Sequence, residues 1–417
     1  MRKPSSNTMK TFSTITIGLL ALSIAGLHAA EPKPEWQNIT AELAKTLGVD
    51  APREIPPKEP GGKVQKSAIY MTHFQGLFVL PNGDVGVINN DKGLHRSTDQ
   101  GATWNKWGED WMKGVAQSSL SLKVYYPDRI GLTMDGPIAV SSDLGKSWTQ
   151  IHKPIVTVTK KDAAPFQGDL NIFAGDMDLS ANMPPKTILG FVHHGELFGG
   201  MFVQTTDGGA KWDWSPPVLR ESRCWLRTGV ASASTLLRGE VQEDKTTPPK
   251  PGIFVSPDLG QTWEKVSDYT LVGTCPVHYG PNIYWAAREG IVVSRDGGKT
   301  WSVCGAAIEN VVFGPYFGKS EQEMMVVSYK EGFSITRDGG KTWKLGAPFF
   351  AAPSAWGEPK NEMTSAPTGS RHWRGALWYF GWDATKNILY ANCFGGDAWK
   401  LALAPAAVGT SEKENGK

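Results

Sequence analysis

The stretch Ser294-Arg-Asp-Gly-Gly-Lys-Thr-Trp301 is one of six copies of the same eight-residue pattern, S/T-x-D-x-G-x-T/S-W. Only the copy at Thr205 differs at the seventh position, where it has Lys211. The other copies begin at Ser97, Ser141, Ser256 and Thr336. Consecutive aspartates are 44, 64, 51, 38 and 42 residues apart: Asp99, Asp143, Asp207, Asp258, Asp296 and Asp338. Each interval fits one small antiparallel sheet, so the spacing predicts a repeat architecture.

The residue types in the pattern predict a turn. An Asp can accept hydrogen bonds from backbone amides a few residues further on, and the Gly two positions later can take a positive φ. The Thr and Trp then resume an extended chain, and the Trp packs on the neighbouring strand. Short apolar runs precede the copies, for example residues 252–255 and 290–293. Each copy is therefore expected to be a hairpin turn between two strands.

This pattern resembles the Asp-box, or BNR repeat, of β-propellers in the sialidase/neuraminidase-like superfamily. The resemblance implies an all-β chain folded as a β-propeller of four-stranded antiparallel blades. In that family each box joins the third strand of a blade to the outermost fourth strand, on the rim away from the central site. We expect seven blades, and six blades with an appended segment is the alternative. The boxes predict architecture and say almost nothing about chemistry.

Composition divides the chain into four segments. Residues 1–30 have a basic start, an apolar run from Ile15 to Ala25 and small residues at the end. They predict a signal peptide, cleaved near Ala29 or Ala30, and a secreted or periplasmic protein with no membrane segment after cleavage. Residues 31–66 are expected to be an N-terminal linker or strap, 67–403 the propeller, and 404–417 a disordered tail. The last blade has no box, and its outer strand is expected from the segment around Trp36.

Charge and cysteine usage narrow the classes of partner. Residues 1–30 hold three of the 43 basic residues and no acidic one, which leaves 40 basic and 41 acidic residues, a net charge of −1. This balance gives no indication of nucleic acid as a partner. No spacing for a metal or a cofactor is present, so none is expected, and we expect a monomer. Cys224 and Cys275 are the predicted disulfide pair, with two buried free thiols as the alternative.

Candidate functional residues lie where the innermost strand of each blade is expected to begin and where the second strand turns into the third. His278 and Tyr279 are the catalytic candidates, because imidazole can move a proton near neutral pH. A guanidinium group can bind a carboxylate through two parallel hydrogen bonds, and a Trp offers a face for a sugar ring. The substrate-binding candidates are Arg223, Arg227, Arg288, Arg371, His372, His73, His193, Glu196 and Trp225.

These residues favour a secreted carbohydrate-active propeller that binds an acidic glycan and cleaves it by hydrolysis or β-elimination. True sialidase activity is not expected, because the Arg-Ile-Pro motif of that family is represented here only by Arg53-Glu-Ile-Pro56, which carries an extra Glu. The alternative is a non-catalytic propeller that binds a glycan or an exported protein. A deep polar pocket with converging titratable groups would favour a catalyst, and a flat aromatic patch would favour a binder.

Overall fold

The chain divides into two compact units, Met1–Lys33 and Pro34–Lys417, and every residue that the structure describes lies in the second unit. The computed structural model describes residues 36–49, 54–55, 61–63, 65–66, 74–89, 92–112, 122–132, 138–151, 155–158, 166–169, 172–179, 183–194, 197–213, 227–241, 250–273, 275–309, 311–328, 332–347, 377–393 and 397–403.

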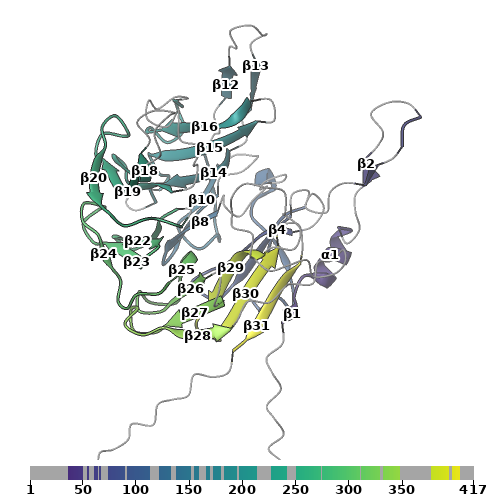
Figure 1. Ribbon diagram of the computed structural model, residues 1–417. Coiled ribbons are helices and arrows are strands. Elements are labelled where there is room, and N and C mark those ends of the chain that lie inside the picture. Colours follow the sequence, from purple (N-terminus) through teal and green to yellow (C-terminus); the bar gives the residue numbers. More distant parts are fainter. Residues whose placement is uncertain are drawn as a thin grey trace, which may run out of the picture. The chain divides into compact units, whose positions relative to one another are not determined.

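Antiparallel strands in these residues form consecutive blades (Figure 1). Blade 1 contains β4 (Phe74–Val79), β5 (Val85–Asn89), β6 (Gly93–Ser97) and β7 (Asn105–Trp107). Blade 2 contains β8 (Leu122–Tyr126), β9 (Arg129–Leu132), β10 (Ile138–Ser141) and β11 (Thr149–Ile151). Blade 3 contains β14 (Ile172–Met177), β15 (Ile188–His194) and β16 (Leu197–Thr205), and an isolated bridge between Gln204 and Asp213 takes the place of its fourth strand.

Four more blades follow. Blade 4 contains β17 (Thr228–Ser232), β18 (Thr235–Val241), β19 (Lys250–Ser256) and β20 (Glu264–Ser267). Blade 5 contains β21 (Val277–Tyr279), β22 (Asn282–Ala287), β23 (Gly290–Ser294) and β24 (Ser302–Val303). Blade 6 contains β25 (Val311–Phe317), β26 (Met324–Ser328), β27 (Gly332–Thr336) and β28 (Lys344–Ala347). Blade 7 contains β29 (Leu377–Asp383), β30 (Ile388–Cys393) and β31 (Ala398–Ala402). These antiparallel blades confirm the all-β propeller that the boxes predicted.

The N-terminal segment completes blade 7. β1 (Gln37–Asn38) pairs antiparallel with β31, so the fourth strand of this blade comes from the segment around Trp36, as the sequence predicted. The backbone amide of Ile39 extends this pairing by donating to the Ala398 carbonyl at 2.9 Å. Joining the first part of the chain to the last sheet covers an edge that would otherwise be open.

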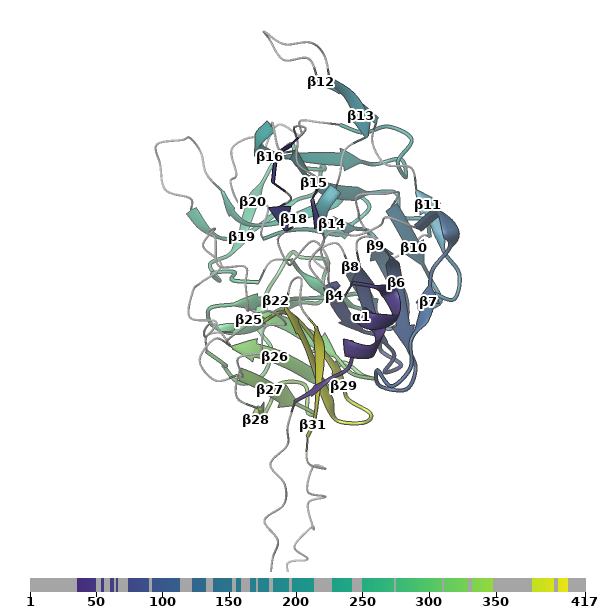
Figure 2. The same ribbon diagram turned by 90° about the vertical axis from the view of Figure 1, so that its right-hand side faces the viewer.

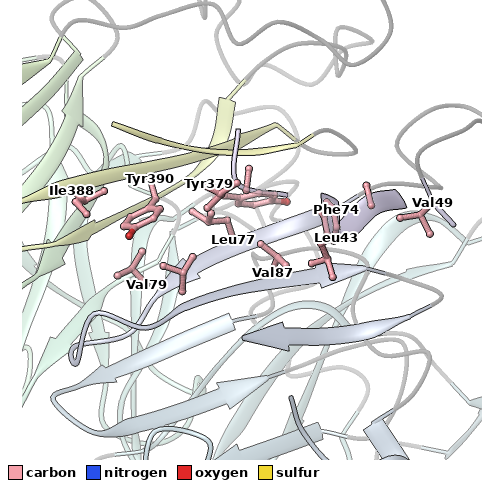
Figure 3. Packing of buried hydrophobic residues seen from close by; sticks show 13 residues of the cluster. Leu43, Val49, Phe74, Leu77, Val79, Val87, Tyr379, Ile388 and Tyr390 are labelled. Carbon is pink, nitrogen blue, oxygen red and sulfur yellow. The ribbon is translucent and has the colours of Figure 1, made fainter. Parts of the chain in front are cut away.

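Helix α1 (Ala41–Leu47) follows β1 and lies against blade 1 (Figure 2). It ends at Gly48, whose φ of 67° gives the left-handed cap that a glycine adopts without strain. The hydrophobic cluster beneath it joins blade 7 to blade 1. Figure 3 shows Leu77 and Val79 of β4 packed against Tyr379 and Tyr390 of blade 7. Similar clusters join blades 1 and 2, 2 and 3, 4 and 5, 5 and 6, and 6 and 7, so much of the core lies between blades.

Three further elements stand outside the blades. η2 (Asp110–Met112) is a short 3₁₀ helix that follows β7. β2 (Glu54–Ile55) and β3 (Gln65–Lys66) form one two-stranded hairpin, and β12 (Ile155–Val158) and β13 (Phe166–Asp169) form another between blades 2 and 3.

The Asp-box turns have the hydrogen bonds that their residue types predicted. In the copy at Ser294, the Asp296 carboxylate accepts hydrogen bonds from the Thr300 amide at 2.9 Å and the Thr300 hydroxyl at 2.6 Å. The Ser294 hydroxyl donates to Asp296 at 2.8 Å and accepts from the Gly298 amide at 2.8 Å. In the irregular copy Lys211 keeps the amide bond to the aspartate, at 2.9 Å, although its side chain has no hydroxyl to supply the second.

Candidate functional site

Strand direction gives the blades two ends. The turn from the first strand to the second lies at the same end as the box, which joins the third strand to the fourth; we call this the box end. At the opposite end the first strand begins and the second turns into the third, and we call this the loop-mouth end. The candidate residues were predicted at the loop-mouth end, and there the described residues have most of their gaps.

Most of the predicted substrate-binding residues fall in these gaps. His193 lies in β15, within its last two residues. Its role, like those of the candidates outside the described residues, stays a prediction. The candidates outside the described residues are His73, Glu196, Arg223, Trp225, Arg371 and His372. Cys224 is also outside them, so its pairing with Cys275 stays a prediction as well.

His278 is buried in the middle of β21, and only 5% of its surface is exposed. Its ring stacks on that of Tyr125 from β8, with centroids 4.8 Å apart. Burial, together with the positive charge of Lys123, lowers its pKa from 6.5 to about 3, so the imidazole is neutral near pH 7. Its Nε2 is buried and makes no hydrogen bond within the described part of the chain. The catalytic role of His278 stays a prediction, and this burial counts against it.

Tyr279 lies at the box end and not at the loop-mouth end. β21 is only three residues long, and Tyr279 pairs with Asn282 across the turn to β22. Its hydroxyl donates to the backbone carbonyl of Lys319 at 3.1 Å, and its ring packs on Phe317 at 5.0 Å. Burial and the neighbouring carboxylates of blade 6 raise the pKa of the Tyr279 hydroxyl. Because β21 ends at Tyr279, this residue lies at the box end, whereas a substrate was expected at the loop-mouth end.

Arg227 lies at the loop-mouth end of blade 4, immediately before β17. Its φ is 77°, in the left-handed region that side chains other than glycine rarely adopt. Its guanidinium Nη1 lies 3.1 Å from the Glu240 carboxylate, while its Nε is buried and has no hydrogen-bond partner among the described groups. A buried donor without a partner costs about 1–3 kcal/mol. One predicted substrate-binding residue therefore has both a strained backbone and a donor without a partner among the described groups.

Arg288 lies at the same end of blade 5, in the turn from β22 to β23, and is exposed. Its amide donates to the Thr270 carbonyl at 2.8 Å, and the next residue, Leu271, bridges to Ala287. A Cβ added at Gly239 would lie 2.8 Å from Arg227 Cβ and 3.0 Å from Leu271 Cδ1. Thr270 therefore bonds directly to the backbone of Arg288, and the side chain of Leu271 lies near Gly239, the glycine that is also next to Arg227. The structure brings Arg227 and Arg288 to one end of adjacent blades.

Sequence reasoning assigned no role to two buried charged residues. Lys123 of β8 and Asp176 of β14 form an ion pair at 3.5 Å in the interior, and burial raises the pKa of the Asp176 carboxyl. A charged residue within a buried strand is rare unless it is paired, and that is the signal that could have pointed to Asp176. Within the described residues, no group of three or more His, Cys, Asp or Glu residues is arranged to hold a metal ion.

Comparison with known proteins agrees with the repeat assignment. The family model described as BNR/Asp-box repeat matches residues 292–303, which include the box at Ser294. No curated protein matches the chain. Among the described residues, no helix is long and apolar enough to cross a membrane.

Several solved structures resemble the fold at low identity. YCF48 from Cyanidioschyzon merolae is 10% identical, with 84% of this chain and 99% of that one covered and a TM-score of 0.37. The GH74 enzyme of Niastella koreensis is 12% identical, with 82% and 55% covered and a TM-score of 0.32. The extracellular domain BT3049 from B. thetaiotaomicron is 12% identical, with 82% and 42% covered and a TM-score of 0.40. Identities and scores this low say nothing about what this chain binds.

The assignment of the fold therefore depends on features of the chain itself. Six boxes occur at blade spacing, the family model matches one of them, and the described sheets follow one another as antiparallel blades. Together these observations identify the chain as an Asp-box β-propeller.

Proposed function

We propose that the chain is an exported β-propeller that binds an acidic carbohydrate at the loop-mouth end of blades 4 and 5 without cleaving it. The observation that carries this proposal is Arg227, with its φ of 77° and its buried Nε that has no partner among the described groups. Strained residues persist where the surrounding structure holds them, and they cluster at ligand sites. A ligand oxygen that accepts from Nε would satisfy this donor.

The charges at this end suit a carboxylate. Glu240 occupies Nη1 of Arg227, whereas the buried Nε has no partner among the described groups and could bind a ligand oxygen only after the side chain moves. Arg288 is exposed on the neighbouring blade and can supply a second fork of donors. Tyr269, which is half-buried next to the segment that contacts both arginines, offers an aromatic ring on which a sugar can pack. These groups favour an acidic sugar over a simple anion.

Binding is favoured over cleavage by the positions of the two catalytic candidates. A general acid or base must come within about 3 Å of the proton that it transfers. His278 is buried between strands, and Tyr279 lies at the box end, while both described arginines lie at the loop-mouth end. These four residues therefore do not make one catalytic group. The non-catalytic alternative drawn from the sequence becomes the better supported one.

The test is calorimetric titration of residues 31–417 with polygalacturonate, alginate, hyaluronan and sialyllactose, with dextran as a neutral control. We expect saturable binding to at least one acidic glycan. Arg227→Ala and Arg288→Ala should each weaken that binding about tenfold or more, which corresponds to about 1.4 kcal/mol. Lys299→Ala is the matched control, because it removes the same charge from an exposed position at the box end of blade 5.

The proposal is contradicted if the folded wild-type protein binds none of the acidic glycans. It is also contradicted if both arginine variants bind as tightly as the Lys299→Ala variant. Preserved thermal unfolding of each variant is needed to separate lost binding from lost structure.

A further inference from the structure

Two inner strands pair across the interior although their blades are not neighbours in the sequence order. β8 of blade 2 and β21 of blade 5 are parallel, with Tyr125 opposite His278 and Tyr126 opposite Tyr279. The Gly280 amide donates to the Tyr126 carbonyl at 3.0 Å, and the Tyr125 hydroxyl donates to the Gly280 carbonyl at 2.6 Å. The two blades thereby form one eight-stranded sheet.

Buried polar groups tie this strand pair to two more blades. Lys123 of β8 donates to the Pro276 carbonyl, just before β21, at 2.6 Å, and lies 3.5 Å from Asp176 of blade 3. The other oxygen of Asp176 accepts from the Val230 amide of blade 4 at 2.9 Å. Blades 2, 3, 4 and 5 therefore meet at two charged side chains.

His278 is the third polar side chain at this meeting point, and it carries no charge there. It stacks on Tyr125 of β8 and is hydrogen-bonded with the backbone of Val230, while Lys123 acts on it as a like charge. Its Nε2 makes no hydrogen bond in the described part of the chain. A proton on Nε2 would place a second cation in the interior beside Lys123, and that is costly without a new partner.

We propose that Lys123, Asp176 and His278 form an acid-sensitive latch, which holds β8 and β21 together while His278 is neutral and releases them when His278 takes up a proton. The latch is independent of the carbohydrate proposal, because it is argued from groups in the interior. The residues that face His278 are Lys123 and Tyr125 from β8 and the backbone of Val230 from β17, and Asp176 of β14 is paired with Lys123.

The direction of the pH effect follows from proton linkage. His278 has a pKa of about 3 in the closed latch, mainly because it is buried, and an ordinary value of 6.5 once it is exposed to solvent. The open state therefore binds more protons between these values. As the pH falls below 6.5, the ratio of open to closed latch should rise by a factor that approaches about tenfold per pH unit.

Asp176 acts in the opposite direction. Burial raises the pKa of its carboxyl in the closed latch, so the closed latch takes up a proton from Asp176 before the open one does. This uptake favours the closed state as the pH falls, and it reduces the slope that His278 produces. The variant Asp176→Asn should therefore make the response to acid steeper.

Hydrogen exchange measured by mass spectrometry tests the latch in residues 31–417 between pH 7 and pH 4.5, with rates corrected for intrinsic exchange. Peptides that cover β8 and β21 should lose protection progressively below pH 6.5. A peptide that covers β30 should not, because blade 7 does not contribute to the latch. His278→Phe keeps a ring that can stack on Tyr125 but cannot be protonated. Its β8 and β21 peptides should show a flat response to acid, or a slightly reversed one.

Two results would overturn the latch. One is a wild-type protein whose β8 and β21 peptides respond to acid no more than the β30 peptide. The other is a His278→Phe variant that keeps the wild-type slope. If His278→Phe does not fold, histidine ¹³C resonances of the wild-type protein give the second measurement. A His278 resonance that titrates near pH 6.5 while β8 and β21 stay protected would contradict the latch.

Discussion

The box turns and the centre of the molecule, by which we mean Lys123, Asp176, His278 and the strands that they join, differ in how far apart in the sequence their hydrogen-bonded groups lie. In the box at Ser294 the bonded groups lie at most four residues apart, as between Thr300 and Asp296. At the centre Lys123 donates to Pro276, 153 positions further along the chain. A local bond leaves a pattern in the sequence because both partners recur together, whereas a long-range bond between two single residues leaves none. The boxes therefore predict the architecture from the sequence, whereas the contacts at the centre become known only from the structure.

The largest effect is expected from breaking the centre. Lys123→Ala removes the cation from a buried carboxylate and should lower the free energy of unfolding by about 3 kcal/mol, because breaking a buried pair leaves an uncompensated charge. Urea denaturation followed by circular dichroism measures this change. Lys344→Ala, an exposed control on β28, should change stability by less than about 0.5 kcal/mol. Equal effects of the two variants would mean that the centre does not hold the fold together.

A smaller and local effect is expected in the boxes. Ser294→Ala removes the acceptor of the Gly298 amide, a buried bond of 2.8 Å, and should cost about 1–2 kcal/mol. Ser256→Ala removes the matching bond in blade 4, at 2.6 Å. The two effects should add within about 0.5 kcal/mol in the double variant, because the two boxes share no hydrogen-bond partner. A coupling energy well above that value would show that the boxes are not separate local units.

The pH dependence of stability should separate the two regions. The folded pKa of His278 is depressed to about 3, so its contribution to stability is lost as the pH falls from 6.5 toward 3. Hydrogen bonds from Thr103 and Ser97 lower the pKa of Asp99 from 3.8 to about 2, so the contribution of this box is lost only as the pH falls through that lower window.

Thermal unfolding as a function of pH measures this difference. His278→Phe should flatten the midpoint curve between pH 6.5 and pH 4, whereas Asp99→Asn should leave that part of the curve unchanged. If Asp99→Asn altered the midpoint curve near pH 6, the loss of stability between pH 6.5 and pH 4 could not be assigned to His278.

The smallest effect on stability is expected at Arg227. Arg227→Gly relieves the strain of a φ of 77°, about 1 kcal/mol, but it loses the partly exposed contact with Glu240 and adds freedom to the unfolded chain. These changes should nearly cancel, so the free energy of unfolding should stay within about 1 kcal/mol of the wild type. A loss of several kcal/mol in urea denaturation would show that Arg227 is a structural residue and not a ligand-binding one.

The sequence predicted the parts of this molecule that are local or repeated. The boxes, the blades between them and the strand contributed by the segment around Trp36 could be read from spacing and apolar runs. The sequence did not predict at which end of its blade Tyr279 lies, because this depends on a first strand of only three residues. The pairing of β8 with β21 could not be predicted either, since a contact between two strands that are distant in the sequence leaves no local pattern.

The candidate site was predictable only in part. Arg227 and Arg288 lie at the loop-mouth end, which strand starts and turns indicated, and their role in binding stays a prediction. Burial of His278 depends on Tyr125, a residue from another blade, so a lone His beside a Tyr was read as a reactive pair. Lys123 and Asp176 were missed because each is a single charged residue whose partner is distant in the sequence.

We propose that His278 helps to hold the interior together and that a glycan is bound elsewhere and not cleaved. The most direct test incubates wild-type and His278→Phe proteins with the acidic glycans at pH 7 and measures new reducing ends, unsaturated products and binding. We expect no product from either protein and equal binding by both. Product formed by the wild type and abolished in a folded His278→Phe variant would contradict it.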